Sequence, residues 1–291
     1  MLKWLWNWFA GGIEVRSPAI SETSAAEPPA RSPGTSFPAL VAGRASPRFE
    51  SASAFLPTAM PDPLPTPTQP AWLTKLPQTV VFLDVETTGI HSDDRIVSLA
   101  AIRIESAALV HKQILTRCTH LIFDPGKKCH PEAARVHGHD EWTLSHQPFF
   151  GDHAEEIRAA IEQADLIVAH NADFDISFVN RELEAAGLPS LTKPHFCTMR
   201  TYRSRFQGRA NLNTVAAHIG MARASHNHGA LEDACIAMNI FLWLHDCPTR
   251  FPITQFAEKP FDNFCSVPSM PDGKLPSRKR RPRRKKATSL L

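Results

Sequence analysis

The chain has 291 residues and a formal net charge of +3 at pH 7. No stretch approaches the roughly 18 consecutive apolar residues of a membrane-spanning helix, which argues against an integral membrane protein. The six cysteines show no CxxC pair and no metal-binding spacing. Scattered cysteines of this kind favour a reducing cytoplasm over a disulfide framework.

Proline content divides the chain into three parts. Residues 1–77 hold 13 of the 25 prolines and show almost no apolar periodicity, which predicts a disordered extension. Residues 78–246 carry regular apolar patterning and predict one folded domain with a sizeable core. Residues 247–291 are again proline-rich and predict a flexible tail. Within that tail, residues 278–286 include eight Lys or Arg, so the rest of the chain is mildly acidic.

The first ten residues are unusually aromatic. As a helix they would group Trp4, Leu5, Trp8 and Phe9 on one face, which could lie on a membrane surface or dock into an unknown partner. The segment lacks a convincing small-x-small cleavage site, which argues against a signal peptide. The alternative is an N-terminal segment with no dedicated role.

The folded region is predicted to begin with strands. Runs of apolar residues bounded by turn signals indicate a buried strand at the start of Val80–Gly89, a second over Arg95–Glu105 and a third within His111–Phe123. The short connections between these strands suggest an antiparallel meander.

After the third strand the apolar period changes to that of helices. We expect one further strand over Leu166–Ala169, followed by a helix that ends near Ala186. Other helices are expected over Pro131–Val136, Ala154–Gln163, Thr198–Phe206, Leu212–Ile219 and Ala230–His245. This order predicts an α/β protein with a ribonuclease-H-like, mixed five-stranded sheet flanked by helices.

The first candidate site residues are Asp84 and Glu86, at the end of the first strand. Side chains alternate across a strand, so both carboxylates project from the same face and repel each other. A divalent cation would relieve this repulsion, and oxygen ligands suit Mg²⁺ or Mn²⁺. The alternative is a strand that ends in solvent at Asp84.

Asp175 and Asp173 are the next candidates, because both lie just beyond the strand at 166–169. Sites in open mixed sheets commonly form at strand ends. Periodicity does not choose between the two, although Asp173 lies one step earlier and fits a helix-capping role better.

The last candidates are His228 and Asp233. Residues five apart on one helix diverge by roughly 140°, so the two converge only if His228 precedes the helix. Gly229 would let the preceding loop bend and move. The alternative is a structural histidine, and His226 is expected at the surface.

Three motifs resemble those of the DEDDh, or DnaQ-like, family of 3′–5′ exonucleases. They are Asp84-x-Glu86-Thr87-Thr88-Gly89, His170-Asn171-Ala172-x-Phe174-Asp175 and His228-x₄-Asp233. The segment Pro131–Gly138 also resembles the corresponding segment of this family, which includes the proofreading epsilon subunit of bacterial DNA polymerase III. The resemblance covers residues 79–245 and favours Asp175 over Asp173 and His228 over His226.

The resemblance implies hydrolysis of phosphodiesters from nucleic-acid 3′ ends to 5′-monophosphates. In the family pattern, two Mg²⁺ or Mn²⁺ ions about 4 Å apart are held by four carboxylates, and a histidine is the general base. The carboxylates correspond to Asp84, Glu86, Asp175 and Asp233, and the base to His228. Matching positions near the terminal nucleotide are Thr87, His137 and Phe174. Phe174 could equally be a core residue.

The resemblance also suggests partners. Single-stranded DNA or 3′ ends are the expected substrates, with RNA as an alternative, and the basic run 278–286 could contact the phosphate backbone or simply aid solubility. A polymerase subunit is another candidate partner, but residues 246–291 show no convincing polymerase- or clamp-binding segment. A stand-alone DNA-repair or RNA-processing exonuclease is therefore the alternative, and a non-catalytic nucleic-acid-binding module is a third. The expected location is the bacterial cytoplasm.

Overall fold

Strand β1 (Thr79–Thr87) is the central strand of the structure, a computed structural model that describes residues 70–111 and 118–272. Its apolar start, Val80 to Leu83, is fully buried, as expected for a strand covered on both faces. The aromatic N-terminal segment, most of the proline-rich extension and the basic run 278–286 lie outside the described residues.

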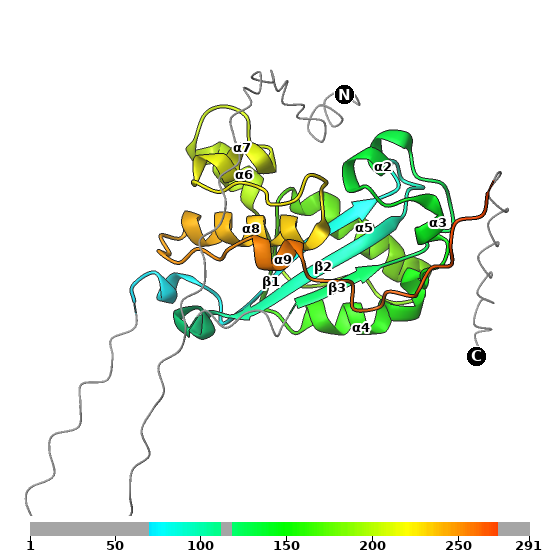
Figure 1. Ribbon diagram of the computed structural model, residues 1–291. Coiled ribbons are helices and arrows are strands. Elements are labelled where there is room, and N and C mark those ends of the chain that lie inside the picture. The colour runs from blue at the N-terminus through cyan, green and yellow to red at the C-terminus, as the bar shows by residue number, and fades with distance from the viewer. Residues whose placement is uncertain (1–69, 112–117, 273–291) are drawn as a thin grey trace, which may run out of the picture. The chain divides into compact units, whose positions relative to one another are not determined.

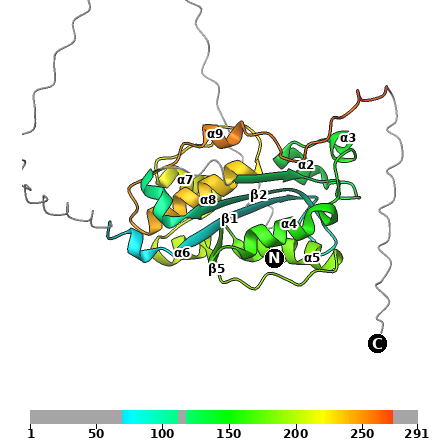
Figure 2. The ribbon, with the colours of Figure 1, turned by 90° about the horizontal axis from the view of Figure 1, so that it is seen from below.

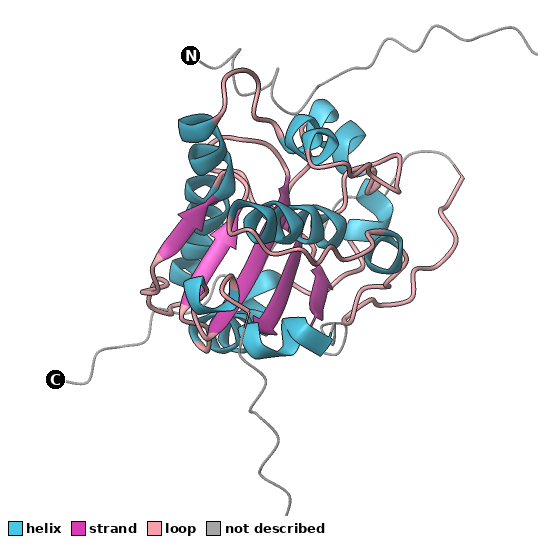
Figure 3. Cartoon of the chain, turned by 90° about the vertical axis from the view of Figure 1, so that its left-hand side faces the viewer, coloured by secondary structure: helices cyan, strands magenta, loops and turns pink. Residues whose placement is uncertain are grey.

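The sheet contains five strands in the order β3-β2-β1-β4-β5 (Figure 3). β1 pairs antiparallel with β2 (Ile96–Glu105), which pairs antiparallel with β3 (Cys118–Ile122). On its other side β1 pairs parallel with β4 (Leu166–Ala169), which pairs parallel with β5 (His195–Cys197). The prediction of a mixed five-stranded sheet is confirmed. β5 has only three residues, too few for an apolar period, and was not located from the sequence.

Helices cover both faces of this sheet (Figures 1 and 2). The predicted helices are present with boundaries shifted by a few residues, and the four-residue α3 and α9 and two short 3₁₀ helices add to them. Their bounds are α2 Pro131–His137, α3 Glu141–Leu144, α4 Phe150–Glu162, α5 Ala172–Ala185, α6 Thr198–Arg205, α7 Leu212–His218, α8 Ala230–Leu244, α9 Thr254–Ala257, η1 Leu73–Lys75 and η2 Ser106–His111. Among residues 70–111 and 118–272, we find no helix whose length and hydropathy would let it cross a bilayer.

The alternation of β1 side chains assigns its two faces to different helices. Val80 and Phe82 pack in a cluster with residues of α8, whereas Val81, Leu83 and Val85 pack in a cluster with residues of α4 and α5. Figure 2 shows α8 on one side of β1 and β2, and α4 and α5 on the other. Even-numbered β1 residues therefore face α8, which determines where the two acidic residues at the end of the strand point.

Helix α8 is buried on nearly all sides, because it lies between the sheet and further chain segments. One of these segments follows it: Phe251 and Phe256 are buried in the same cluster, and Asn239 of α8 accepts a hydrogen bond from the backbone N–H of Phe251 at 2.8 Å. The packed part of the chain thus extends beyond residue 246, where the sequence predicts a flexible tail to begin. The sparse apolar residues of this segment have no regular period, so only packing against α8 reveals them as core.

Candidate active site

Asp84 and Glu86 lie on the even-numbered face of β1, the face that is directed toward α8. Glu86 is 5% exposed and Asp84 is half-buried, so neither carboxylate is at a frayed strand end. Their strand neighbours on β2 are Ala100 and Ser98, which bring no charge to compensate them. The alternative of a strand that ends in solvent at Asp84 is wrong.

Asp175 reaches the same place from the neighbouring strand. Because β1 and β4 are parallel, their carboxyl ends lie at one edge of the sheet, and α5 begins just after β4. Asp175 lies in the first turn of α5, is 3% exposed, and accepts a hydrogen bond from the backbone N–H of Val85 at 3.2 Å. This bond connects Asp175 directly to the segment between Asp84 and Glu86.

Asp173, the alternative to Asp175, is exposed, and its side chain contacts residues outside the acidic group. It forms an ion pair with Arg200 and lies 3.2 Å from His195 Nε2. It does not cap α5 either, since the N-cap position is Asn171, whose backbone is left-handed at φ 86°. The capping role suggested by the sequence is therefore wrong for Asp173.

His228 and Asp233 converge in the way that their spacing requires. His228 precedes α8 and Asp233 lies in its first turn, and His228 Nδ1 is 3.1 Å from Asp233 Oδ2. Gly229 between them has φ −137° and ψ 127°, an extended backbone that any residue adopts. This conformation does not itself require glycine, and the bending expected of the loop at Gly229 stays a prediction. The His228 backbone N–H donates to the carbonyl of Val136 at 2.9 Å. His226 is exposed, as expected.

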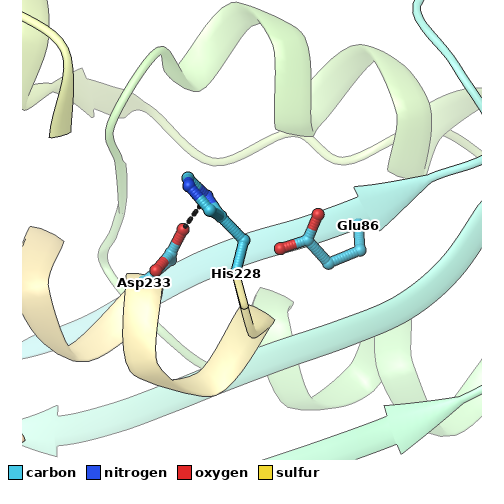
Figure 4. A group of neighbouring side chains, drawn as sticks. All are labelled: Glu86, His228 and Asp233. Atoms are coloured by element: carbon cyan, nitrogen blue, oxygen red, sulfur yellow. Dashed lines mark hydrogen bonds and ion pairs between the residues drawn. The ribbon is translucent and has the colours of Figure 1, made fainter. Parts of the chain in front are cut away.

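Three of these side chains form a compact group that could hold a metal ion. Candidate ligand atoms of Glu86, His228 and Asp233 all lie within 4.8 Å of one another. Figure 4 shows Glu86 on β1 with its carboxylate directed toward His228, and the contact between His228 and Asp233. Asp84 and Asp175 are not part of this tightest group, but the charge of Asp233 acts on both and adds to burial in raising their pKa values.

The pKa values of three carboxyl groups are raised well above the ordinary range. Burial is the main cause for Asp84, followed by the negative charges of Asp175, Asp233 and Glu86. Burial also dominates for Glu86 and Asp175, and both are raised further by Asp233. Buried carboxylates whose charges oppose one another favour a bound cation.

Asp233 behaves differently from the other three carboxylates. Burial alone would raise its pKa, but the Arg223 guanidinium and the hydrogen bond with His228 outweigh burial and lower it. Arg223 forms an ion pair with Asp233 Oδ1, and its side chain is only 11% exposed. Asp233 is therefore the member of the group that keeps its negative charge most readily.

Arg223 and Glu232 also belong to the site, although neither is a candidate from the sequence. Glu232, 2% exposed, accepts hydrogen bonds from the backbone N–H groups of Ala224 and Ser225 at 2.5 and 3.2 Å, and lies 3.3 Å from Arg223 Nη1. It thereby fixes the loop that leads to His228. In the sequence both residues resemble ordinary charged surface residues, and no period or spacing marks them.

A pocket that is open to solvent adjoins the acidic group. Glu86, Thr87 and His137 line it together with apolar side chains of Val85, Ile90, Ala133 and Val136. The pKa of His137 is lowered to about 3 by burial and by His139, so its imidazole is neutral at physiological pH. Thr87 donates from its hydroxyl to the carbonyl of Gly89 at 2.6 Å.

Phe174 is not among the residues that line this pocket. Its ring centroid lies 4.7 Å from that of Phe178. Phe174 is partly buried and packs against the hydrophobic cluster that β1 forms with α4 and α5. The described contacts of Phe174 are thus those of a core residue. This is the alternative that the sequence left open.

The donor set fits divalent ions. Carboxylate oxygens from three elements, with one imidazole beside them, are ligands that Mg²⁺ and Mn²⁺ accept. The raised pKa values of Asp84, Glu86 and Asp175 point to a deficit of positive charge at this position. A mixed sheet with an acidic group at the end of its central strand defines the class of ribonuclease-H-like nucleases.

Comparison with known families specifies the class further. The RNase_T family model, described as exonuclease, matches residues 81–241. This match spans more than half of the chain, and the chain belongs to this exonuclease family. The predicted assignment to the 3′–5′ exonucleases is thereby confirmed.

Two similar relatives are DNA polymerase III epsilon subunits. The chain is 31% identical to the subunit of Rickettsia felis over 172 residues, which is 56% of this chain and 72% of the relative. It is 28% identical to the subunit of Buchnera aphidicola over 177 residues, which is 57% of this chain and 73% of the relative. The resemblance to the DnaQ-like exonucleases is confirmed by these similarities.

A solved structure shares the fold. The zinc-bound complex of E. coli exonuclease I with single-stranded DNA aligns with a TM-score of 0.50 and 18% identity. The alignment covers 58% of this chain and 42% of exonuclease I. At this identity the similarity supports the ribonuclease-H-like fold and nothing more specific.

Proposed function

We propose that the chain is a metal-dependent 3′–5′ exonuclease that releases nucleoside 5′-monophosphates from nucleic-acid 3′ ends. The observation that supports this best is the convergence of Asp84, Glu86, Asp175 and Asp233, which come from β1, α5 and α8. These four carboxylates would hold two Mg²⁺ or Mn²⁺ ions. Bound ions of this kind activate water and neutralise the charge that develops on the phosphate.

His228 is proposed as the general base. Its Nδ1 faces Asp233 Oδ2 at 3.1 Å, so a neutral imidazole that donates there carries its lone pair on Nε2. Nε2 can then take a proton from the attacking water. Asp233 has two tasks in this arrangement, since it orients the imidazole and contributes a carboxylate oxygen to the ion site.

The terminal nucleotide is proposed to enter the pocket beside Glu86. The mostly apolar lining can contact a base or a sugar, while Thr87 and the neutral His137 offer polar groups at its wall. Phe174 is retained as a third proposed substrate contact, from family likeness alone.

Single-stranded DNA, or DNA 3′ ends, is the proposed substrate class. The relatives named as DNA polymerase III epsilon subunits support the choice of DNA. The test is parallel digestion of single-stranded DNA, duplex DNA and RNA by the purified chain with Mg²⁺ or Mn²⁺. We expect 5′-monophosphates from the single-stranded DNA and no product when a chelator is present. Full activity in excess chelator contradicts metal dependence, and preference for RNA contradicts the substrate class.

We further propose that the chain associates with a DNA polymerase subunit, which is more specific than the proposed activity. The relatives named as polymerase III epsilon subunits support it. Co-elution of the chain with a replicative polymerase subunit from the same source is the expected result, and separate elution favours a stand-alone repair or RNA-processing exonuclease.

Three expectations from the sequence stay predictions. They are phosphate contact by residues 278–286, docking of the aromatic N-terminus to a partner or membrane surface, and a bacterial cytoplasmic location. Truncation after Pro276 checks the first: it should weaken binding to long duplex DNA and reduce the salt slope by roughly 0.9 for each phosphate that the tail neutralises.

A further inference from the structure

Asp233 differs from the other acidic residues of the site in that protein groups engage both of its carboxylate oxygens. Oδ2 faces His228 Nδ1 at 3.1 Å, and Oδ1 forms an ion pair with Nη1 of Arg223. Any cation that binds Asp233 must therefore share it with a guanidinium that is already in place.

Arg223 is held firmly at this position. Its Nη1 also contacts Glu232 Oε2 at 3.3 Å, and its Nε and Nη2 donate to Asn213 Oδ1 of α7 at 3.4 and 3.3 Å. With partners on α7 and α8 and 11% side-chain exposure, the guanidinium cannot swing away without breaking several bonds at once. It is a fixed positive charge beside the acidic group.

The charges of the site define the consequence. The four carboxylates carry four negative charges, which two divalent ions balance completely. Arg223 adds a fifth positive charge in direct contact with Asp233, and Glu232, 3.3 Å from Arg223 Nη1, brings the negative charge that balances it. Like charges in contact with the same carboxylate repel each other, and burial strengthens the repulsion because the local dielectric is low. The ion that shares Asp233 with the guanidinium experiences this repulsion most and is therefore expected to be the weaker of the two.

We propose that Arg223 is a built-in counter-cation of the active site, a positioning residue that holds Asp233 in the ion-free protein and opposes binding of the weaker divalent ion. Glu232 and Asn213 serve to keep the guanidinium in place. This inference rests on the metal dependence proposed above. It adds that the chain itself, through a residue outside the acidic motifs, sets how tightly the second ion binds.

The test is direct measurement of Mn²⁺ binding to the purified full chain, with free Mn²⁺ monitored by electron paramagnetic resonance. Arg223→Gln removes the charge and keeps a polar side chain, and it should tighten the weaker Mn²⁺ site about tenfold, the effect expected of one like charge beside a buried site. Arg223→Lys shortens the side chain but retains the charge, and it should stay within about twofold of the unsubstituted chain.

Two further variants keep the test decisive. Arg95→Gln removes another partly buried arginine, which pairs with Glu182, and it should leave Mn²⁺ affinity unchanged. Asn213→Asp, at an exposed position of α7, places a negative charge against the guanidinium and should tighten the weaker site about threefold even if Arg223→Gln does not fold.

Unchanged or weaker Mn²⁺ binding by both Arg223→Gln and Asn213→Asp overturns the role of Arg223. An equal change in Arg95→Gln also overturns it, since the effect would then be general destabilisation. If the unsubstituted chain binds no Mn²⁺, the proposed metal dependence itself fails, which is a separate result from any difference among the variants.

Discussion

Two groups of buried carboxylates in this domain are arranged in opposite ways. Glu182 of α5 is paired with Arg95, and its Oε1 also lies 3.4 Å from the backbone N of Ile96. Its charge is balanced by the neighbouring arginine. At the end of β1, the buried Glu86 and Asp175 lie with the half-buried Asp84, and all three have raised pKa values. Among the four acidic residues of the site, Arg223 forms its ion pair with Asp233.

The difference distinguishes a structural carboxylate from a functional one. Burying a charge costs free energy unless a partner compensates it, and Glu182 has that partner within the fold. Under the proposed metal dependence, the acidic group at β1 would instead leave most of its charge to a cation from solution. Variants of the two groups should therefore fail in different ways: loss of activity at β1 and loss of stability at Glu182.

The largest effect is expected for Asp84→Ala. Removal of this carboxylate should reduce hydrolysis of single-stranded DNA to background, because the ion site loses one of its ligands. The ion-free protein should remain folded and become no less stable, since one source of repulsion is gone. Activity assays and thermal unfolding in a chelator check the two statements. Retained turnover shows that Asp84 is not a ligand.

His228→Ala should lower the rate about 10²–10⁴-fold, the usual contribution of a general base. Thermal stability and Mn²⁺ binding should change little, because the four carboxylates remain. His226→Ala is the matched control, since His226 is exposed two residues away. It should hardly change the rate of hydrolysis. Loss of stability with an unchanged rate per folded molecule contradicts the catalytic role of His228.

Glu182→Ala should destabilise the domain by about 3–5 kcal/mol, because it leaves the partly buried Arg95 without its partner. Chemical denaturation provides the measurement. The rate per folded molecule and the Mn²⁺ affinity should stay close to those of the unsubstituted chain. If Glu182→Ala instead binds Mn²⁺ more weakly at unchanged stability, Glu182 does not differ in role from the acidic group at β1.

The smallest effect is a pH dependence of the ion-free protein. Burial and mutual repulsion raise the pKa values of Asp84, Glu86 and Asp175 above their ordinary 3.8, 4.5 and 3.8. The folded state therefore holds protons that the unfolded state releases, and this stabilisation is lost as pH rises above those ordinary values. Asp233 acts in the opposite direction, and so do four histidines whose pKa values are lowered by burial, which makes stability rise with pH up to about 6.5: His120, His137, His139 and His170.

Thermal unfolding in a chelator from about pH 5 to about pH 8 tests this dependence when the unsubstituted chain is compared with Asp84→Asn, because the histidines contribute equally to both. We expect the midpoint temperature of the unsubstituted chain to fall relative to that of Asp84→Asn as pH rises, and this relative fall to be smaller when Mg²⁺ is present. A midpoint that does not fall relative to Asp84→Asn shows that the three carboxyl groups do not oppose one another in the folded protein.

The sequence alone predicted much of this protein. The apolar run before Asp84 and the change from a strand period to a helix period depend on local patterns, which persist whatever the tertiary context. Alternation along β1 already placed Asp84 and Glu86 on one face, and the five-residue spacing required His228 to lie outside α8. Motif likeness then selected Asp175 over Asp173.

Only the tertiary structure decided which charges meet. The path of the loop between α7 and α8 brings Arg223 against Asp233, and Glu232 holds this loop in place through hydrogen bonds to its backbone. Neither Arg223 nor Glu232 carries a distinguishing pattern in the sequence. Packing against α8 likewise decided that the chain beyond residue 246 belongs to the core, because scattered apolar residues such as Phe251 and Phe256 show their role only when a partner surface is present. Burial and neighbouring charge arise from the whole fold, so local sequence could not reveal them.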